Sequence, residues 1–196
     1  VIENGSVELQ DYPFVDLILG KEKQTKMGRG AMALEFKTFT PSMQQALTDY
    51  CQKGGSLFIS GAYVGSDLWD NPMANQTDKD FATEVLKYKW RAGQAAIEGK
   101  VKSVTSPYSV LGIQYTYYNE LNAESYVVES PDAIEPATNE AFTILRYSEN
   151  NLSAGIAYKG KYKTFVTGFP FESLRSESER ESLMKSVLDF FDSPTE

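Results

Sequence analysis

Short apolar runs and amphipathic stretches follow one another along the chain and predict strands and helices in turn. Residues 14–19 form a short, largely apolar run, which is typical of a strand buried on both faces of a parallel sheet. Thr40 and Pro41 suit the N-cap and the first position of a helix, and Gly54-Gly55 marks its end. A second buried-strand run covers residues 56–60. This order predicts a right-handed βαβ unit.

The middle of the chain carries weaker patterns. Residues 80–90 place apolar side chains at helical spacing, so we expect a second helix there. Residues 96–128 contain shorter strand-like pieces, among them 112–118. Residues 129–140 are rich in Pro, Asp, Glu and Asn, and they predict a loop.

The end of the chain predicts a strand, a hairpin and a helix. Residues 142–147 form the strand, and residues 154–158 and 164–167 flank Lys159-Gly160-Lys161, a hairpin signal. Residues 178–191 are amphipathic, which predicts a terminal helix. Its inward face should hold Leu183, Met184, Val187, Leu188 and Phe191.

Composition limits what the chain can be. Its 196 residues, 41% of them hydrophobic, suffice for one core, and we predict a single α/β domain over residues 1–196. No apolar run approaches the roughly 20 residues of a membrane span, so we expect no membrane insertion. The net charge of −8 argues against nucleic acid as a partner.

The residue types exclude several kinds of chemistry. The chain has no histidine, which excludes a Ser-His-Asp triad, a Cys-His dyad and an imidazole metal site. Its one cysteine, Cys51, cannot form an internal disulfide. Asp67, Asp70, Asp78 and Asp80 lack the spacing of a calcium loop. We therefore expect no metal and no cofactor.

Two sequence segments show a resemblance to a known family. They are Gly-Ser-Leu-Phe-Ile-Ser-Gly at residues 55–61 and Gly-Phe-Pro-Phe-Glu at residues 168–172. Together with the predicted βαβ unit, they resemble the class I glutamine amidotransferase-like superfamily, whose fold is flavodoxin-like. More narrowly, the chain is similar to the domain of secreted Bacteroidetes proteins labelled xanthan lyase or amidase.

The resemblance implies a fold and a location. The implied fold is a three-layer α/β sandwich with a mostly parallel central sheet, followed by a C-terminal hairpin and helix. The family fold begins with one more strand and helix, so we expect part of the domain to lie upstream of Val1. The implied location is extracellular or periplasmic.

The resemblance also implies a degenerate catalytic site. The family's Gly-x-Cys-x-Gly turn matches residues 61–65, where Tyr63 stands in place of the nucleophilic cysteine. The family's His-Pro-Glu segment matches Pro170-Phe171-Glu172 approximately. The family's acidic residue is therefore present as Glu172, whereas its histidine base is absent. A tyrosine phenol has a pKa near 10 and is a poor nucleophile at neutral pH. Glutaminase activity is therefore excluded, as in a pseudoenzyme.

A ligand site is expected after the second strand. Tyr63, Asp67, Trp69 and Asp70 would lie at the carboxyl ends of the strands, where open α/β sheets bind ligands. Aromatic rings beside carboxylates suit sugar binding. The alternative is that Tyr63 and Trp69 are packing residues with polar tips.

The C-terminal segment and a tyrosine-rich segment offer further candidates. Glu172 and Arg180 are candidate ligand-binding residues, whereas the alternative is that Glu172 pairs with Arg175 or Arg180 near the last helix. The tyrosines at positions 115, 117 and 118 suit either a stacking platform for glycan or a half-buried strand.

Two functions stay open from the sequence. The first is a non-catalytic module of a larger secreted protein, which packs against neighbouring domains of the parent polypeptide or binds polysaccharide. The second is a polysaccharide- or peptidoglycan-processing enzyme that uses Tyr63, Glu172 and Arg180. In a lyase of that kind, the tyrosine would act as base or acid and the arginine would neutralise a uronate.

Overall fold

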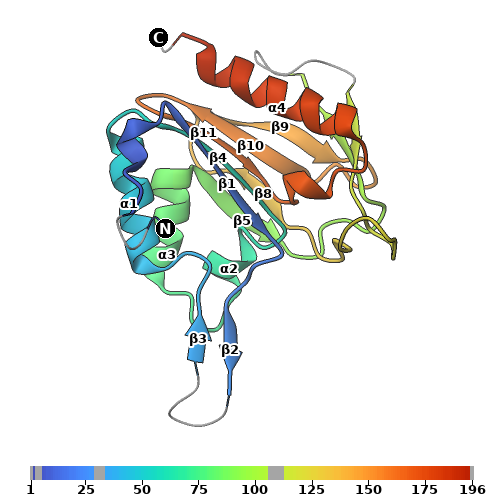
Figure 1. The fold of residues 1–196 in the computed structure, drawn as a ribbon, viewed down its shortest axis with the longest axis horizontal. Coiled ribbons are helices and arrows are strands. Elements are labelled where there is room, and N and C mark those ends of the chain that lie inside the picture. The colour runs from blue at the N-terminus through green and yellow to red at the C-terminus, as the bar shows by residue number, and fades with distance from the viewer. Residues whose placement is uncertain (1, 3–5, 29–33, 106–112, 195–196) are drawn as a thin grey trace.

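The computed structural model describes residues 2, 6–28, 34–105 and 113–194. Within them, seven strands form one sheet in the order β1-β4-β11-β10-β9-β6-β7 (Figure 1). Their bounds are β1 (Phe14–Gly20), β4 (Ser56–Gly61), β6 (Lys100–Ser103), β7 (Gln114–Thr116), β9 (Ala141–Tyr147), β10 (Ser153–Lys159) and β11 (Lys163–Thr167). Two smaller ladders pair β2 (Thr25–Met27) with β3 (Leu34–Phe36), and β5 (Tyr88–Ala92) with β8 (Ala133–Pro136).

The sheet is mixed, so the prediction of a three-layer sandwich with a mostly parallel central sheet is wrong. Only β1, β4 and β11 run parallel to one another, whereas every other pairing described in this sheet is antiparallel. The connections at residues 148–152 and 160–162 are too short for the crossover that parallel strands need. The sheet curls into a half-barrel dominated by antiparallel strands.

Helix α1 (Pro41–Gln52) confirms the expected N-terminal capping signal. The Thr40 hydroxyl accepts a hydrogen bond from the Met43 N–H at 3.2 Å, which satisfies one of the unpaired donors at a helix start. Leu47, Tyr50 and Cys51 are buried on its inner face.

Helix α4 (Glu177–Asp192) confirms the predicted terminal helix. Ser176 and Glu179 form a capping box at its start, in which each side chain binds the backbone of the other residue. The helix buries Leu183, Val187, Phe190 and Phe191. Of these, Phe190 was not expected to face inward.

Alternating side chains of β4 join two different hydrophobic clusters. Phe58 belongs to the cluster that contains the buried residues of α4. Leu57 and Ile59 belong to the cluster that contains the buried residues of α1. Because successive strand residues point to opposite faces, β4 lies between the two cores and is buried along most of its length.

The segment after β4 differs from the predicted helix over residues 80–90. It contains α2 (Ser66–Trp69), α3 (Gln76–Asp80) and a π-helix, η3 (Phe81–Leu86). Lys87 then adopts a left-handed conformation with φ 70°, and the chain continues as β5. The predicted loop over residues 129–140 supplies the partner strand, β8. Strand pairing between these distant segments thus overrides the local helical pattern.

Strand β1 is a strand as predicted, but it is not buried on both faces. It lies at the edge of the sheet, and Phe14 and Ile18 expose 44% and 49% of their surface. Two short 3₁₀ segments, η1 (Leu9–Asp11) and η4 (Phe171–Ser173), lie near the start and the end of the chain. Across the described residues, no helix is long and apolar enough to span a bilayer.

Gly168 provides a test of how closely the sheet packs against the β8 segment. A Cβ at this position would lie 2.0 Å from the Asp132 carbonyl oxygen, and the Asp132 N–H donates to the Gly168 carbonyl at 2.8 Å. We expect Gly168→Ala to lower the free energy of unfolding by about 3 kcal/mol, because two backbone segments must separate. Urea denaturation measures this loss.

Gly93→Ala is the matched control, since its Cβ would lie 3.7 Å from the nearest heavy atom, an oxygen of Asp132. Equal unfolding midpoints for the two variants would contradict the packing described for Gly168.

Candidate functional site

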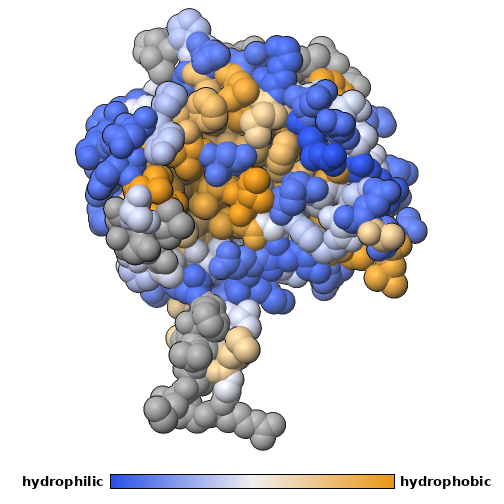
Figure 2. All heavy atoms as spheres, viewed as in Figure 1, coloured by the Kyte–Doolittle hydropathy of each residue, from blue (hydrophilic) through white to orange (hydrophobic). Residues whose placement is uncertain are grey.

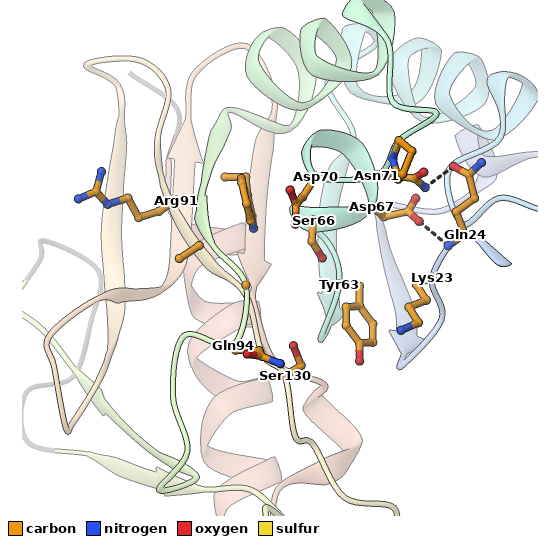
Figure 3. A pocket seen from close by; sticks show the side chains of 14 residues that line it. Lys23, Gln24, Tyr63, Ser66, Asp67, Asp70, Asn71, Arg91, Gln94 and Ser130 are labelled. Atoms are coloured by element: carbon orange, nitrogen blue, oxygen red, sulfur yellow. Dashed lines mark hydrogen bonds between the residues drawn. The ribbon is translucent and has the colours of Figure 1, made fainter.

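A cavity of about 690 Å³ opens beside the carboxyl ends of β1 and β4 (Figure 3). Segments that are distant in the sequence meet there: the residues after β1, the turn and helix after β4, strand β5 with the residues that follow it, and Ser130 before β8. The polar and aromatic residues that line it are Lys23, Gln24, Tyr63, Ser66, Asp67, Asp70, Asn71, Trp90, Arg91, Gln94 and Ser130.

Two aromatic side chains contribute to the wall of the cavity. Tyr63 is half-buried, and the Lys23 ammonium lies 4.8 Å from its ring centroid, within range of a cation–π interaction. Trp90 projects from β5 and donates its indole N–H to Asp132 Oδ1 at 3.2 Å. Both rings therefore have polar partners, Lys23 and Ser130 for Tyr63 and Asp132 for Trp90, while part of their surface lines the cavity.

Asp67 holds the segment after β1 in place. Its Oδ1 accepts the Gln24 N–H at 2.6 Å, and the side chain of Asn71 donates to the Gln24 side chain. Only 3% of Asp67 is exposed, and burial raises the pKa of its carboxyl against the lowering effect of the hydrogen bonds. Asp67 thus shapes the rim, and Asp70 is the exposed carboxylate of the cavity.

Asp132 lies behind the cavity and is fully buried. One carboxylate oxygen accepts the N–H groups of Gly65 and Ser66, each at 2.7 Å. Burial raises the pKa of Asp132 to about 7, although its hydrogen-bond donors, among them Trp90, lower it. The two backbone donors after β4 are occupied by this carboxylate, so they do not point at a free position where an oxyanion would form.

The predicted site residues divide into two groups. Tyr63, Asp67 and Asp70 line the cavity together, and Figure 3 shows Tyr63 beside Lys23 and Asp67 beside Gln24. Trp69 instead packs against the cluster that contains α1.

Glu172, Arg180 and Pro170 lie outside the lining of this cavity. Glu172 Oε1 accepts the Tyr126 hydroxyl at 2.5 Å, and Arg180 donates to the Leu174 carbonyl. Pro170 precedes η4, and its carbonyl accepts the Ser173 hydroxyl at 2.6 Å. Among the described residues Glu172 forms no ion pair, with Arg175, Arg180 or any other cation.

The tyrosine-rich segment belongs mainly to the core. Tyr115 and Tyr117 expose 2% and 0% of their surface, so they are not available to stack on a ligand. Tyr118 is partly exposed, and its hydroxyl donates to Glu124.

Several residues of the cavity were not found from the sequence: Lys23, Gln24, Trp90, Arg91, Gln94 and Ser130. One signal was available for Trp90, because Tyr88 and Trp90 alternate with Lys89 and Arg91, a period typical of a strand. The polar residues carry no comparable local signal.

The residues of the cavity can contact a ligand and form hydrogen bonds with it. Burial and the nearby charge of Glu129 raise the pKa of Tyr63, so its phenol is neutral at pH 7. In the part of the chain that the structure covers, no cluster of three or more Cys, Asp or Glu side chains is arranged to hold a metal ion.

Comparisons with known proteins identify a fold and no family. No protein-family model matches the chain, and no curated protein does. Part of a cold-adapted β-galactosidase from Rahnella sp. R3 is similar in structure, with a TM-score of 0.56 and 12% sequence identity. The match covers 96% of this chain and 24% of the β-galactosidase, so the chain spans about a quarter of that protein's length.

A second solved structure, the N-terminal domain of mmIFT52, matches 80% of this chain and 73% of its own chain, with a TM-score of 0.46 and 14% identity. The β-galactosidase match and the mixed, curled sheet correct the resemblance to class I glutamine amidotransferase-like, flavodoxin-like proteins. The comparisons likewise give no support to a xanthan lyase or amidase label.

The buried Asp132 carboxyl predicts a dependence of stability on pH. Its folded-state pKa of about 7 lies above that of an exposed Asp, so ionisation opposes folding. Relative to Asp132→Asn, the wild type should lose unfolding free energy as the pH rises from about 4 to about 7, by at most about 4 kcal/mol. Above that pH the difference should stay constant.

Urea denaturation of both proteins across this pH range measures the difference. Asp70→Asn controls for the loss of a carboxylate at an exposed position. A difference that is flat in pH, or that moves in favour of the wild type as pH rises, would contradict the ionisation of Asp132 described above.

Proposed function

We propose that this chain is a non-catalytic module that binds a carbohydrate segment in the cavity beside Tyr63 and Trp90. The observation that carries the proposal is the combination of two aromatic side chains with carboxylate, amide and hydroxyl groups around one open cavity. The apolar faces of sugar rings pack on aromatic rings, and sugar hydroxyls bind polar groups that both donate and accept. A few placed polar groups in such a cavity determine orientation and specificity.

The polar side chains of the cavity can form hydrogen bonds with the hydroxyl groups of a sugar. Asp70 accepts hydrogen bonds, and Asn71 and Gln94 both donate and accept them. Lys23 lies over Tyr63 and supplies a positive charge at the same wall. Because Asn71 and Asp67 fix the Gln24 segment, the rim is organised before a ligand arrives, which reduces the entropy lost on binding.

The same surroundings argue against catalysis. An acyl- or glycosyl-transfer site needs a nucleophile with a base, or a pair of carboxyl groups flanking the bond. The chain has no histidine, the Tyr63 pKa is raised, and Asp132 occupies the backbone donors of Gly65 and Ser66. The alternative enzyme needs Tyr63, Glu172 and Arg180 together, whereas the cavity contains only Tyr63.

Replacement of Tyr63 tests the binding site. Neutral and uronate-containing oligosaccharides are titrated into the protein by calorimetry, and the best ligand is repeated with Tyr63→Ala. We expect affinity to fall at least about tenfold, which is about 1.4 kcal/mol, because one stacking surface is lost.

Tyr118→Ala is the matched control, since Tyr118 is a partly exposed tyrosine outside the cavity. If no oligosaccharide binds the folded protein, or if the two tyrosine variants lose affinity equally, the proposed site is wrong.

The non-catalytic part of the proposal has a separate test. We expect each bound oligosaccharide to be recovered unchanged after prolonged incubation, as mass spectrometry would show. Cleavage by the wild type that Tyr63→Phe abolishes would instead establish the enzyme alternative.

A further inference from the structure

A hydrophobic surface lies over β1 and beside α4, and none of its residues lines the cavity. Figure 2 shows it as an apolar area with a hydrophilic residue in its middle. Phe14 and Ile18 of β1 are 44% and 49% exposed, and Asp16, between them, is exposed as well. Residues two apart on a strand share a face, so the three side chains stand in one row. The Phe14 ring also lies 6.3 Å from that of Phe191 on α4.

Strand β1 also has an open edge. It is the first strand in the sheet order, and in the described part of the chain its ladder partner is β4 alone. An edge of this kind presents unpaired N–H and C=O groups to any extended segment that approaches. Apolar contact and backbone hydrogen bonds are therefore offered at the same place.

Two carboxylates give this surface a negative centre. Glu172 lies on η4, which contacts β1. Partial burial of the Asp16 carboxyl, and to a smaller extent the charge of Glu172, raise the pKa of Asp16 to about 6. Glu172 Oε1 binds Tyr126, but Glu172 Oε2 is buried and has no hydrogen-bond partner among the described residues. No cation of the described chain forms an ion pair with either carboxylate.

Because Gly20 has no side chain, the backbone at the end of β1 can lie close to Glu172 and Tyr126. The φ of Gly20 is +56°, and a Cβ there would lie 3.1 Å from Glu172 Oε1 and 3.2 Å from the Tyr126 hydroxyl. The glutamate is thus held against the end of β1. An ionised carboxylate that lies beside apolar side chains and has no ion-pair partner is electrostatically unfavourable. A positive charge supplied by another molecule would stabilise its ionised form.

We propose that the edge and the exposed face of β1 dock an extended segment of a partner protein that carries Lys or Arg between apolar residues. The segment adds a strand beside β1, its apolar side chains contact Phe14 and Ile18, and its cation reaches Asp16 and Glu172. A second copy of this chain fits poorly. Pairing β1 with β1 would bring both acidic pairs together, in molecules that each carry a net charge of −8.

A pair of labelled peptides tests the proposal. Each has seven residues of alternating Val and Thr, with either Arg or Glu at the centre, and fluorescence anisotropy reports binding to the full chain. We expect the Arg peptide to bind at least about tenfold more tightly than the Glu peptide, and Asp16→Lys to reverse this preference. Equal binding of the two peptides, or no binding of either, would overturn the proposal.

Two further variants test whether the peptide binds at β1 or responds to any added surface lysine. Ile18→Lys should weaken binding of the Arg peptide, whereas Ile97→Lys should not, because Ile97 is 76% exposed and lies outside β1. Circular dichroism confirms that each variant is folded. Sedimentation equilibrium should find the wild type monomeric at tens of micromolar. A dimer that Ile18→Lys disperses would assign the surface to a second copy and overturn the proposal.

Discussion

The buried Asp132 carboxylate holds together the parts of the chain that form the cavity. It accepts hydrogen bonds from the turn after β4 and from Trp90 on β5. The backbone of the same residue binds the sheet, since its carbonyl accepts the Tyr147 hydroxyl at 2.7 Å and its N–H donates to Gly168 at 2.8 Å. Four segments therefore take their relative positions from one residue. The burial that makes these bonds strong also opposes ionisation of the carboxyl, so the arrangement depends on every donor being present.

This constraint also determines what the cavity can do. The backbone donors at the start of α2 already bind a carboxylate within the protein, so the cavity presents side chains in place of an oxyanion site. Tyr63 and Trp90 are each held by a polar partner, which keeps their rings in place before a ligand arrives. The binding proposal rests on this organisation of aromatic and polar groups. The docking proposal for β1 rests on separate residues, so either proposal can fail without the other.

The parts of the fold that local signals determine could be predicted from the sequence. The Thr40 cap, the Gly54-Gly55 stop and the turn at residues 159–161 set the bounds of α1 and of the β10–β11 hairpin within about two residues. The sheet was wrongly predicted to be mostly parallel, because the parallel arrangement at one end was extended beyond β1, β4 and β11. Strand β5 was missed because it depends on a left-handed Lys87 and on pairing with β8, about forty residues away. Three cavity residues follow β4 directly and were predicted, whereas Trp90 and Ser130 come from segments that only the tertiary fold brings there.

The most direct test of the binding account uses the two tryptophans of the chain, Trp69 and Trp90. Their indole N–H groups give separate resonances in a ¹⁵N-correlated NMR spectrum, and only Trp90 lines the cavity. The account predicts that titration with a bound oligosaccharide shifts the Trp90 indole resonance and the Gly93 amide to saturation, while the Trp69 indole stays unchanged. Binding that leaves Trp90 and Gly93 unmoved, or that shifts both indoles equally, would contradict a carbohydrate site in this cavity.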